Sequence, residues 1–285
     1  MWQVIVNGEL VPEADATVHV SDLGLRRGYA AFDFFRLVDG VPLFFEDHLA
    51  RFARSRGMLG LDGRWPEDEI RGLVAQLIEA NGLRNEGIQI VLTGGYSADM
   101  FTPGEPNLII AQLPAPMAPA QLYETGVKVI THDNVRELPE AKTTDYLIAV
   151  KLIPQMTKAG AIEVLYHDGD RMSEGARSGF GIVTADGVLV TAAQGVLESI
   201  TLKRVLHVAE DLMPVELRHI TADEFERAPE AFLTGTTRGI LPITQVDDRP
   251  VGNGTVGPHT KRLIEAFHRE VDDYLTAAST SRTAS

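Results

Sequence analysis

Lys142 and Glu174 are the two residues whose types and spacing could most directly carry chemistry. Lys142 lies in the segment Glu140-Ala-Lys-Thr-Thr-Asp-Tyr146, and Glu174 lies 32 residues later (174 − 142) in Met172-Ser-Glu-Gly-Ala-Arg-Ser178. A lysine amine forms a Schiff base with an aldehyde when burial or a nearby positive charge lowers its pKa. A carboxylate can keep the ring nitrogen of a cofactor protonated. The pair therefore suits pyridoxal phosphate chemistry, although a solvated lysine and a turn glutamate are the ordinary alternatives.

Two further segments could hold a phosphate group. Glu198-Ser-Ile-Thr201 stands directly before a predicted helix, and the unpaired backbone N–H groups of a helix start bind anions. Thr234-Gly-Thr-Thr237 follows the apolar run Ala231-Phe-Leu233, and hydroxyls with a glycine in a strand-end loop suit the same ligand. Arg51, on a helix predicted over 46–58, could supply a cation. Each feature also has an ordinary interpretation, as a helix start, a turn or a solvated arginine.

Length and charge set the first limits on function. The chain has 285 residues, which is enough for one large domain or two ordinary ones. Its hydrophobic share of 44% and charged share of 23% are those of a globular protein. A net charge of −14 argues against binding to nucleic acid or to an anionic membrane, because both need a basic face.

Missing residue types exclude further classes of function. The chain has no cysteine, which excludes disulfides, thiolate metal sites and cysteine nucleophiles. Its eight histidines show no metal-ligand spacing, so we expect no metal site. We see no apolar stretch of the roughly 18 residues that a membrane span needs, and no N-terminal signal sequence. We therefore expect a cytoplasmic protein.

Local patterns predict an α+β fold. Asn7-Gly8 and Asp39-Gly40 are strong signals for hairpin turns, and periodic apolar residues mark the helices. In the N-terminal part we predict strands at 2–6, 32–38, 41–45, 88–93 and 107–113 and helices at 46–58 and 66–80. In the C-terminal part we predict strands at 127–131, 163–166, 180–184 and 188–191, helices at 145–160 and 201–211, and a last helix that begins at Gly257-Pro258.

Proline content predicts the domain boundary. Three prolines lie between residues 114 and 119, and they resist both helix and sheet. We therefore predict a small N-terminal α/β domain at 1–113, a linker at 114–120 and a larger C-terminal domain at 121–285. Residues 276–285 are small and polar, so we expect them to be disordered.

One glycine pattern is misleading. Gly252-Asn-Gly-Thr-Val-Gly257 fits the spacing of a dinucleotide-binding loop. It follows Asp247-Asp-Arg-Pro250 instead of a strand, and only 28 residues remain after it (285 − 257), too few for the unit that such a site requires. We interpret it as a loop before the last helix.

Five segments occur in one order that matches a known family. They are Phe45-x-x-His-Leu-x-Arg51, Lys142-Thr-Thr-Asp-Tyr146, Ser173-Glu-Gly-Ala176, Ser199-Ile-Thr201 and Thr234-Gly-Thr236. With them the chain resembles the fold-type IV pyridoxal-phosphate enzymes, which include D-amino-acid and branched-chain aminotransferases and aminodeoxychorismate lyase. The resemblance runs from Asn7-Gly8 to Gly257-Pro-x-Thr260. It implies pyridoxal 5'-phosphate as cofactor, two α/β domains, and a homodimer.

The resemblance also implies roles for individual residues. Lys142 would form the internal aldimine and then move a proton between the substrate α-carbon and the cofactor. Glu174 would pair with the pyridinium nitrogen, and Tyr146 would contact the phenolic oxygen. The phosphate would be bound by Arg51, Ile200, Thr201, Thr236 and Thr237.

Substrate recognition is where the chain departs from the family pattern. Gly87-Ile-Gln89 stands where branched-chain enzymes have Tyr-x-Arg, and Asp99-Met-Phe101 stands where well-known D-amino-acid enzymes have Arg-x-His. A guanidinium group binds a carboxylate best. We therefore predict that Arg27 and one of Arg177 or Arg238 bind the substrate carboxylate.

Three other positions complete this comparison with the family. Phe32 and Gln89 join the predicted substrate-binding set. Gly179 stands where the family usually has asparagine. The resemblance is closest to a divergent D-amino-acid aminotransferase branch. In that branch three segments recur together: Arg27-Gly-Tyr29, Leu92-Thr-Gly-Gly-Tyr-Ser97 and Glu174-Gly-Ala-Arg-Ser178.

The resemblance implies transamination between D-amino acids and 2-oxo acids, with 2-oxoglutarate as the acceptor. Because the usual carboxylate-binding residues are absent, an (R)-amine or branched-chain L-amino-acid transaminase is an alternative. Aminodeoxychorismate lyase is an alternative with a different reaction. A non-catalytic cofactor-binding protein is the third class, and the presence of both Lys142 and Glu174 argues against it.

Overall fold

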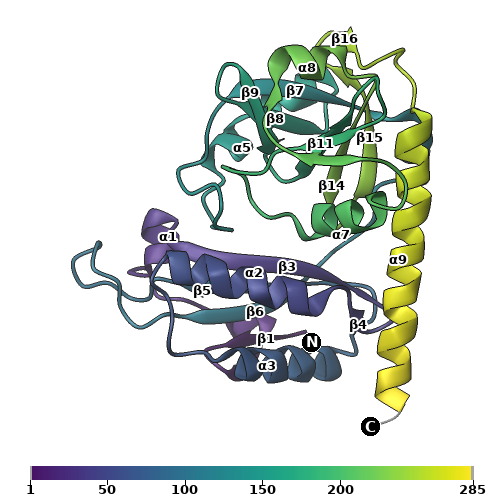
Figure 1. Cartoon of the computed structure of the whole chain (residues 1–285). Helices are drawn as coiled ribbons and strands as arrows, with labels where there is room; N and C mark the ends of the chain where they lie inside the picture. The colour runs from purple at the N-terminus through teal and green to yellow at the C-terminus, as the bar shows by residue number, and fades with distance from the viewer. Residues whose placement is uncertain (1, 284–285) are drawn as a thin grey trace. The chain divides into compact units, whose positions relative to one another are not determined.

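The computed structural model (Figure 1) describes residues 2–283, and their contacts form two units. The first unit comprises residues 2–116, 141–145 and 274–283, and the second comprises 117–140 and 146–273. Residues 114–119 lie in neither a helix nor a strand, while their role as a linker remains a prediction, as do the domain boundaries. The short segment that carries Lys142 is grouped with the first unit, although most of its sequence neighbours belong to the second.

An antiparallel sheet with the strand order β2-β1-β6-β5-β3-β4 forms the centre of the first unit. Its strands are β1 (Gln3–Val6), β2 (Glu9–Pro12), β3 (Ala30–Val38), β4 (Val41–Pro42), β5 (Gly87–Thr93) and β6 (Leu108–Leu113). Both predicted hairpin turns are present. Asn7 and Gly8 have φ of 52° and 89°, and Asp39 and Gly40 have φ of 51° and 79°, as a two-residue turn with left-handed residues requires.

Two helices, α2 (Phe45–Met58) and α3 (Glu67–Asn81), pack their apolar sides against this sheet. The unit also contains the short helices η1 (Glu13–Asp15) and α1 (Leu23–Arg27). Leu49 and Phe52 of α2 and Leu77 of α3 join Phe35 of β3 in one buried cluster. The predicted strand over 41–45 ends already at Pro42, because Phe44 takes a left-handed conformation (φ 53°) and Phe45 begins α2.

The second unit is built on a larger mixed sheet. Within residues 2–283 its strand order is β12-β11-β10-β14-β15-β7-β8-β9-β13, and β16 pairs with β15. The two outermost strands, β12 and β13, are separated in sequence by residues 218–219 alone, so the sheet must curl to bring its ends together. The strands are β7 (Val127–Asp133), β8 (Glu163–His167), β9 (Arg171–Gly175), β10 (Gly179–Val183), β11 (Leu189–Thr191), β12 (Val215–Leu217), β13 (Ile220–Thr221), β14 (Glu230–Gly235), β15 (Gly239–Val246) and β16 (Arg249–Pro250).

The remaining helices are α4 (Ala120–Thr125), α5 (Leu147–Lys151), α6 (Ile153–Ala159), α7 (Ile200–Ala209), α8 (Ala222–Arg227) and α9 (Pro258–Thr283). The single helix predicted over 145–160 is wrong, because the chain forms α5 and α6 with a break at Leu152. Pro154 explains the break, since it has no N–H to continue α5 and is well placed in the first turn of α6. Gly160 ends α6 in the left-handed conformation, as predicted.

The predicted disorder of residues 276–285 is wrong for residues 276–283, which continue α9. Ser279 and Thr280 donate their hydroxyls to the carbonyls of Leu275 and Thr276, at 2.8 and 2.9 Å, so these small polar side chains are compatible with the helix. Residues 284 and 285 lie outside the described part of the chain. No helix among residues 2–283 is both long and apolar enough to span a membrane.

A buried carboxylate fixes the start of α9. Glu230, 6% exposed at the start of β14, accepts hydrogen bonds from the backbone N–H of His259 at 3.1 Å and from the N–H and hydroxyl of Thr260, both at 2.7 Å. A Cβ atom at Gly257 would lie 2.0 Å from the Glu230 carboxyl carbon, so this close approach requires glycine. Glu230 therefore satisfies N–H groups that a helix start leaves without partners.

Replacing Glu230 with alanine should therefore destabilise the protein. The N–H groups of His259 and Thr260 lose a charged acceptor, so we expect the free energy of unfolding to fall by about 2 kcal/mol, measured by urea denaturation. Glu226→Ala is the matched control, because Glu226 forms an ion pair with Arg249 at the surface. That change should cost less than about 0.5 kcal/mol. Equal effects of the two substitutions would contradict the assigned role.

Candidate active site

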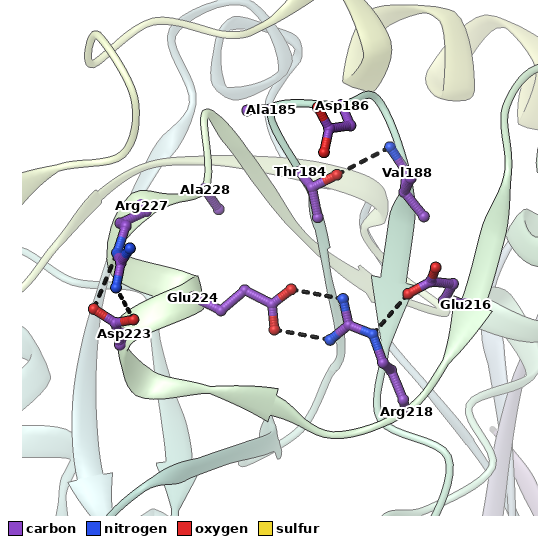
Figure 2. A pocket seen from close by; sticks show the side chains of 10 residues that line it. All are labelled: Thr184, Ala185, Asp186, Val188, Glu216, Arg218, Asp223, Glu224, Arg227 and Ala228. Carbon is purple, nitrogen blue, oxygen red and sulfur yellow. Dashed lines mark hydrogen bonds and ion pairs between the residues drawn. The ribbon is translucent and has the colours of Figure 1, made fainter.

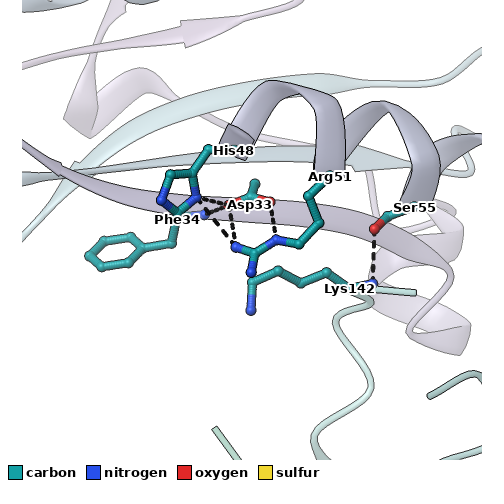
Figure 3. Close-up of polar contacts among 6 residues, drawn as sticks. All are labelled: Asp33, Phe34, His48, Arg51, Ser55 and Lys142. Atoms are coloured by element: carbon teal, nitrogen blue, oxygen red, sulfur yellow. Dashed lines mark hydrogen bonds and ion pairs between the residues drawn. The ribbon is translucent and has the colours of Figure 1, made fainter. Parts of the chain in front are cut away.

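A buried ion pair organises the part of the site that lies in the first unit. Asp33, on β3, is fully buried. Its carboxylate accepts hydrogen bonds from Nε and Nη2 of Arg51, both at 2.8 Å, and Nδ1 of His48 lies 2.7 Å away (Figure 3). His48 and Arg51 stand three residues apart on α2, so both face the same strand. The arginine predicted to bind phosphate therefore has its charge balanced by a buried carboxylate.

The charges of this cluster are set by burial and by pairing. Burial acts to raise the pKa of Asp33, but Arg51 and His48 outweigh it and hold that pKa well below its ordinary value. Burial lowers the pKa of His48, although Asp33 acts in the opposite direction. His48 is therefore neutral at neutral pH, and its Nδ1–H donates to Asp33.

Lys142 is fixed through its backbone to two elements of the first unit. The N–H of Phe32 donates to the Lys142 carbonyl at 2.9 Å, and the N–H of Thr144 donates to the Ala30 carbonyl at 3.0 Å. The N–H of Lys142 donates to the buried hydroxyl of Ser55 on α2 at 3.0 Å. Its Nζ lies 4.6 Å from the centroid of the Phe32 ring. The predicted nucleophile is thus hydrogen-bonded to the same strand and helix that carry the Asp33 cluster. Its charge acts on His48.

Glu174 is held in place within the second unit. This carboxylate on β9 is 8% exposed and accepts a hydrogen bond from Nε of Arg136 at 2.8 Å. The backbone N–H of Leu197 donates to its second oxygen at 3.2 Å. Tyr166 lies on the neighbouring strand β8, and burial raises the pKa of Tyr166 to about 12, so its phenol stays protonated. Tyr146, the residue before α5, belongs to this unit as well.

The N-terminus of α7 offers a site for an anion. Ser199 caps this helix, and its hydroxyl accepts from the N–H of Leu202 at 3.2 Å. Ile200 and Thr201 are buried, and within residues 2–283 their backbone N–H groups donate to no acceptor. Buried N–H donors without partners are costly, and an anion such as a phosphate would satisfy them.

A second predicted phosphate segment lies beside this helix start. Thr234 is the residue before the last in β14, and its hydroxyl lies 3.4 Å from that of Ser199. Thr236 and Thr237 follow in the turn between β14 and β15. A Cβ atom at Gly179 would lie 2.5 Å from the Thr234 hydroxyl, so β10 can approach this turn only with glycine at that position. This contact gives a physical reason for the departure from asparagine at residue 179.

The three candidate substrate arginines differ in their surroundings. Arg238 donates to the fully buried carboxylate of Glu163 at 2.5 Å and to the hydroxyl of Ser178. Arg177 is exposed, and no side-chain hydrogen bond or ion pair forms on it within the described residues. Arg27 is exposed on α1, where its Cζ lies 4.5 Å from the centroid of the Phe101 ring. Arg238 is therefore committed to a structural ion pair, whereas Arg27 and Arg177 present their charge to solvent.

The two other predicted substrate residues lie on neighbouring strands of the first unit. Phe32 is on β3 and contacts Lys142, as described above. Gln89 is on β5, where it pairs with Phe34, and its side chain is partly exposed. The structure thus gathers the predicted site residues into two sets, with Arg27, Phe32, Arg51, Gln89 and Lys142 in the first unit and Tyr146, Glu174, Arg177, Ile200, Thr201, Thr236, Thr237 and Arg238 in the second.

Comparison with known proteins identifies the family. Residues 30–246 match the family model described as amino-transferase class IV. The chain belongs to the class IV aminotransferase family. It is thus a pyridoxal 5'-phosphate-dependent aminotransferase with the fold-type IV architecture, and this confirms the resemblance and the cofactor predicted from the sequence.

Individual relatives cover almost the whole aminotransferase. A D-alanine aminotransferase of Staphylococcus epidermidis is 31% identical over 281 residues, which span 96% of this chain and 99% of the relative. The structure of the Escherichia coli branched-chain amino acid aminotransferase has a TM-score of 0.86 and 27% identity, with 95% of this chain and 94% of that chain covered. The branched-chain aminotransferase of the archaeon Thermoproteus uzoniensis, solved with norvaline, has a TM-score of 0.82 and 28% identity, with coverage of 96% and 97%.

The described residues fit this cofactor. The unpaired N–H groups of Ile200 and Thr201 suit its phosphate, and the Glu174 carboxylate, oriented by Arg136, suits its protonated ring nitrogen. Bound pyridoxal phosphate supplies an electron-withdrawing ring that stabilises negative charge on the substrate α-carbon. The chain would supply the amine of Lys142 and the groups that hold the ring.

Several residues of this arrangement were not predicted from the sequence. The Asp33 carboxylate balances the charge of Arg51, and the Glu163 carboxylate balances that of Arg238. The guanidinium of Arg136 balances the charge of Glu174. A signal existed for Asp33, since a lone carboxylate inside the apolar run Phe32-Asp-Phe-Phe35 must have a buried partner. The sequence offers no comparable signal for Arg136 or Glu163, because each pairs with a residue far away in the chain.

A surface cavity of about 400 Å³ in the second unit carries none of these residues (Figure 2). It is lined by Thr184, Ala185, Asp186, Val188, Glu216, Arg218, Asp223, Glu224, Arg227 and Ala228. Arg218 donates to Glu224 at 2.7 and 2.8 Å and to Glu216 at 2.7 Å, and Arg227 pairs with Asp223. Its arginines thus already have carboxylate partners, and we assign it no ligand.

The buried histidine should make stability depend on pH. Because the pKa of His48 is lowered in the folded state, the unfolded chain binds more protons below its ordinary pKa of about 6.5. The free energy of unfolding should therefore fall as pH decreases from 7 to 5. His48→Gln removes the titrating ring and keeps an N–H donor for Asp33, so its urea midpoint should fall less over this range.

A second histidine provides the control for this measurement. His207 is exposed on α7, and His207→Gln should leave the pH dependence as in the wild type. A decrease in the His48→Gln midpoint as steep as that of the wild type would show that His48 is not buried in its neutral form.

Proposed function

We propose that this aminotransferase moves an amino group between D-amino acids and 2-oxo acids, with 2-oxoglutarate as the acceptor. The observation that carries the proposal is its similarity over 96% of its length to a D-alanine aminotransferase. Other D-alanine aminotransferases, from Staphylococcus and Bacillus species, match over nearly the same range. Branched-chain enzymes share the fold at 27% and 28% identity, which makes an L-branched-chain donor the second candidate.

In this proposal Lys142 provides the amine that attaches the cofactor and then moves a proton to and from the substrate α-carbon. An ammonium group cannot accept that proton, so Lys142 must become neutral during the reaction. The Asp33 carboxylate balances Arg51, and the folded state keeps His48 neutral, so the charges around the amine are fixed before substrate binds.

The ring and the phosphate of the cofactor would be held by the remaining residues of the predicted set. Glu174 would keep the ring nitrogen protonated, because a paired carboxylate stabilises that proton. Ile200 and Thr201 would bind the phosphate through N–H groups, Thr236 and Thr237 through hydroxyls, and Arg51 through its charge. Tyr146 would donate to the phenolic oxygen.

Arg27 and Arg177 are the arginines that we propose for the substrate carboxylate. Both present their charge to solvent, whereas Arg238 is paired with Glu163. Removing Arg238 would leave a buried carboxylate unpaired, which is costly and unrelated to substrate. Phe32 and Gln89 would line the substrate side chain, because they lie on the strands next to Lys142.

The homodimer and the cytoplasmic location remain predictions. Leu147, Val150 and Ile153 are 73%, 60% and 49% exposed at a spacing of three residues along α5 and the start of α6. Such an apolar stripe suits contact with a second copy. A monomeric mass in sedimentation velocity at micromolar concentration would contradict the dimer.

A half-reaction screen tests the proposed donor. The cofactor-loaded protein is mixed separately with D- and L-alanine, D- and L-glutamate, L-leucine and both enantiomers of 1-phenylethylamine, and its visible absorbance is followed. We expect D-alanine or D-glutamate to react fastest. Lys142→Ala should lose at least about 10⁴-fold in rate, since both the amine and the proton carrier are removed.

Each alternative predicts a different result in the same screen. Faster reaction with L-leucine would favour a branched-chain enzyme, and faster reaction with (R)-1-phenylethylamine would favour an amine transaminase. The lyase needs one added substrate: release of pyruvate from aminodeoxychorismate, without any amino-group transfer to 2-oxoglutarate, would identify it.

Arg177→Ala tests the second carboxylate-binding arginine. Loss of a charge-assisted hydrogen bond should raise KM for D-amino acids at least about tenfold, while kcat changes little. Arg171→Ala is the matched control, because Arg171 is an exposed arginine at the start of β9, the strand that precedes Arg177. A KM increase shared by Arg171→Ala would mean that overall charge, and not Arg177 itself, attracts the substrate.

A further inference from the structure

Phe101 is an aromatic residue at the surface of the first unit, with 73% of its area exposed. Cζ of Arg27 lies 4.5 Å from its ring centroid, which is a cation–π distance. Apart from this contact, Arg27 donates from Nη1 to the carbonyl of Arg26 at 3.2 Å. The Phe101 ring is therefore the surface against which the guanidinium rests.

A single carboxylate shapes the loop that carries Phe101. Asp99 accepts hydrogen bonds from the backbone N–H groups of Phe101 at 2.9 Å and Thr102 at 2.7 Å. It also accepts from the hydroxyls of Ser97 at 3.0 Å and Thr102 at 2.7 Å. Between these residues Met100 takes a left-handed conformation (φ 67°), which is uncommon for methionine. Four hydrogen bonds to the Asp99 carboxylate thus hold the loop in a conformation that presents Phe101.

The charge of Asp99 persists over the whole neutral and mildly acidic range. The N–H groups of Thr102 and Phe101 hold the pKa of Asp99 well below its ordinary value, with smaller contributions from the two hydroxyls. A depressed carboxylate pKa means that these hydrogen bonds persist above about pH 4 and weaken only in stronger acid. The hydrogen bonds of Asp99 that shape the loop therefore do not depend on pH above about pH 4.

A buried network fixes α1, which carries Arg27, to the base of the same loop. Asp22 is 1% exposed and accepts from the N–H of Gly24, the hydroxyl of Thr93 and the amide of Asn107, each at 2.7 Å. The N–H of Leu23 donates to the Gly95 carbonyl at 2.9 Å, and that of Ser97 donates to Ser21 at 3.1 Å. Arg27 and Phe101 are thus brought together by buried contacts of the backbone and not by their own attraction alone.

The same turn is attached to the segment of the predicted nucleophile. Gly28, which ends α1 in the left-handed conformation, accepts the hydroxyl of Thr144 at 3.0 Å. Thr144 follows Lys142 by two residues, and the N–H of Thr144 is bound to Ala30. A shift of α1 would therefore also strain the Lys142 segment.

We propose that Phe101 determines specificity for carboxylate substrates by holding the Arg27 guanidinium flat on its ring, with Asp99 as the positioning residue that presents Phe101. A stacked guanidinium keeps its edge N–H groups available, and these groups bind a carboxylate in the plane of the fork. The ring also lowers the conformational entropy that Arg27 would lose when substrate binds. This inference rests on the proposed function, in which Arg27 binds the substrate carboxylate.

Glutarate is the probe for this proposal, because it has carboxylates but no amine or keto group to react. Its Kd for the cofactor-loaded enzyme is measured by isothermal titration calorimetry. Phe101→Leu keeps an apolar side chain but removes the π face, and we expect a Kd roughly two- to fivefold higher. KM for D-alanine should rise by a similar factor while kcat stays within about twofold.

Two substitutions control for general damage to the loop. Phe101→Tyr retains an aromatic ring, so this variant should have the Kd and KM of the wild type. Met100→Leu changes the neighbouring exposed side chain and should leave both constants unchanged. A Phe101→Leu protein that binds glutarate as tightly as the wild type would overturn the proposal, as would a Met100→Leu protein that binds it equally poorly.

A double-mutant cycle tests the role given to Asp99. Asp99→Asn keeps the shape of the side chain and weakens its four hydrogen bonds, so KM should rise. If Asp99 acts through Phe101, the double variant should be no worse than Phe101→Leu. Effects that multiply would show that Asp99 acts by another route and overturn its assignment.

Failure of this inference is distinguishable from failure of the proposed function. The proposed function fails if the wild-type enzyme reacts with no D-amino acid in the half-reaction screen. The inference fails if the wild type transaminates an amino acid of either configuration and Phe101→Leu changes neither the glutarate Kd nor KM.

Discussion

A buried carboxylate must be paired, and this constraint governs how the chain positions its chemistry. Asp33 binds Arg51 and His48, Glu174 binds Arg136, and Glu163 binds Arg238 and Ser178. An isolated carboxylate in an apolar core costs several kcal/mol, and breaking such a pair costs about 3–5 kcal/mol, so each pair forces two distant segments into one geometry. Lys142 depends on this constraint through Ser55, which lies one turn beyond Arg51 on α2. The precision of the site therefore comes from charges that never need to touch the substrate.

Pairing also determines which positive charges can act on a ligand. Arg51, Arg136 and Arg238 are each balanced by a carboxylate, and in this state they attract an anion less strongly from a distance. Arg27 and Arg177 are the predicted substrate residues whose charge is not offset by a bound carboxylate in the described part of the chain. In a protein with a net charge of −14 such local positive charges are valuable, because the overall field repels anionic substrates. In the function that we propose, binding of an amino acid or 2-oxo acid would then depend on a few exposed guanidinium groups and not on the average surface.

What could be predicted from the sequence was local. Asn7-Gly8 and Asp39-Gly40 form the expected turns, because the required left-handed conformations are properties of those residues themselves. The segments around Lys142 and Glu174 and the start of α7 were recognised from short motifs, and the family match confirms the kind of enzyme they imply. The ion pairs could not be predicted, since their partners are 18, 38 and 75 residues apart and nothing local encodes the pairing. Local propensity also misled in two places, at Pro154, which divides one predicted helix into two, and at residues 276–283, where helix continues through serine and threonine.

Gly179 is a residue at which the sequence motif and the long-range contacts can be compared. The motif alone gives no reason for this glycine, which stands where the family usually has asparagine. The contacts give one, since any Cβ atom at this position would collide with the hydroxyl of Thr234 and crowd Ser199. With glycine, β10 packs against β14, and Ser178 donates to Glu163 at 2.7 Å while Arg238 binds both. Ser178, the residue before this glycine, thus shares Glu163 with Arg238. In the function that we propose, Arg177, which is exposed, would therefore meet the substrate carboxylate in place of Arg238.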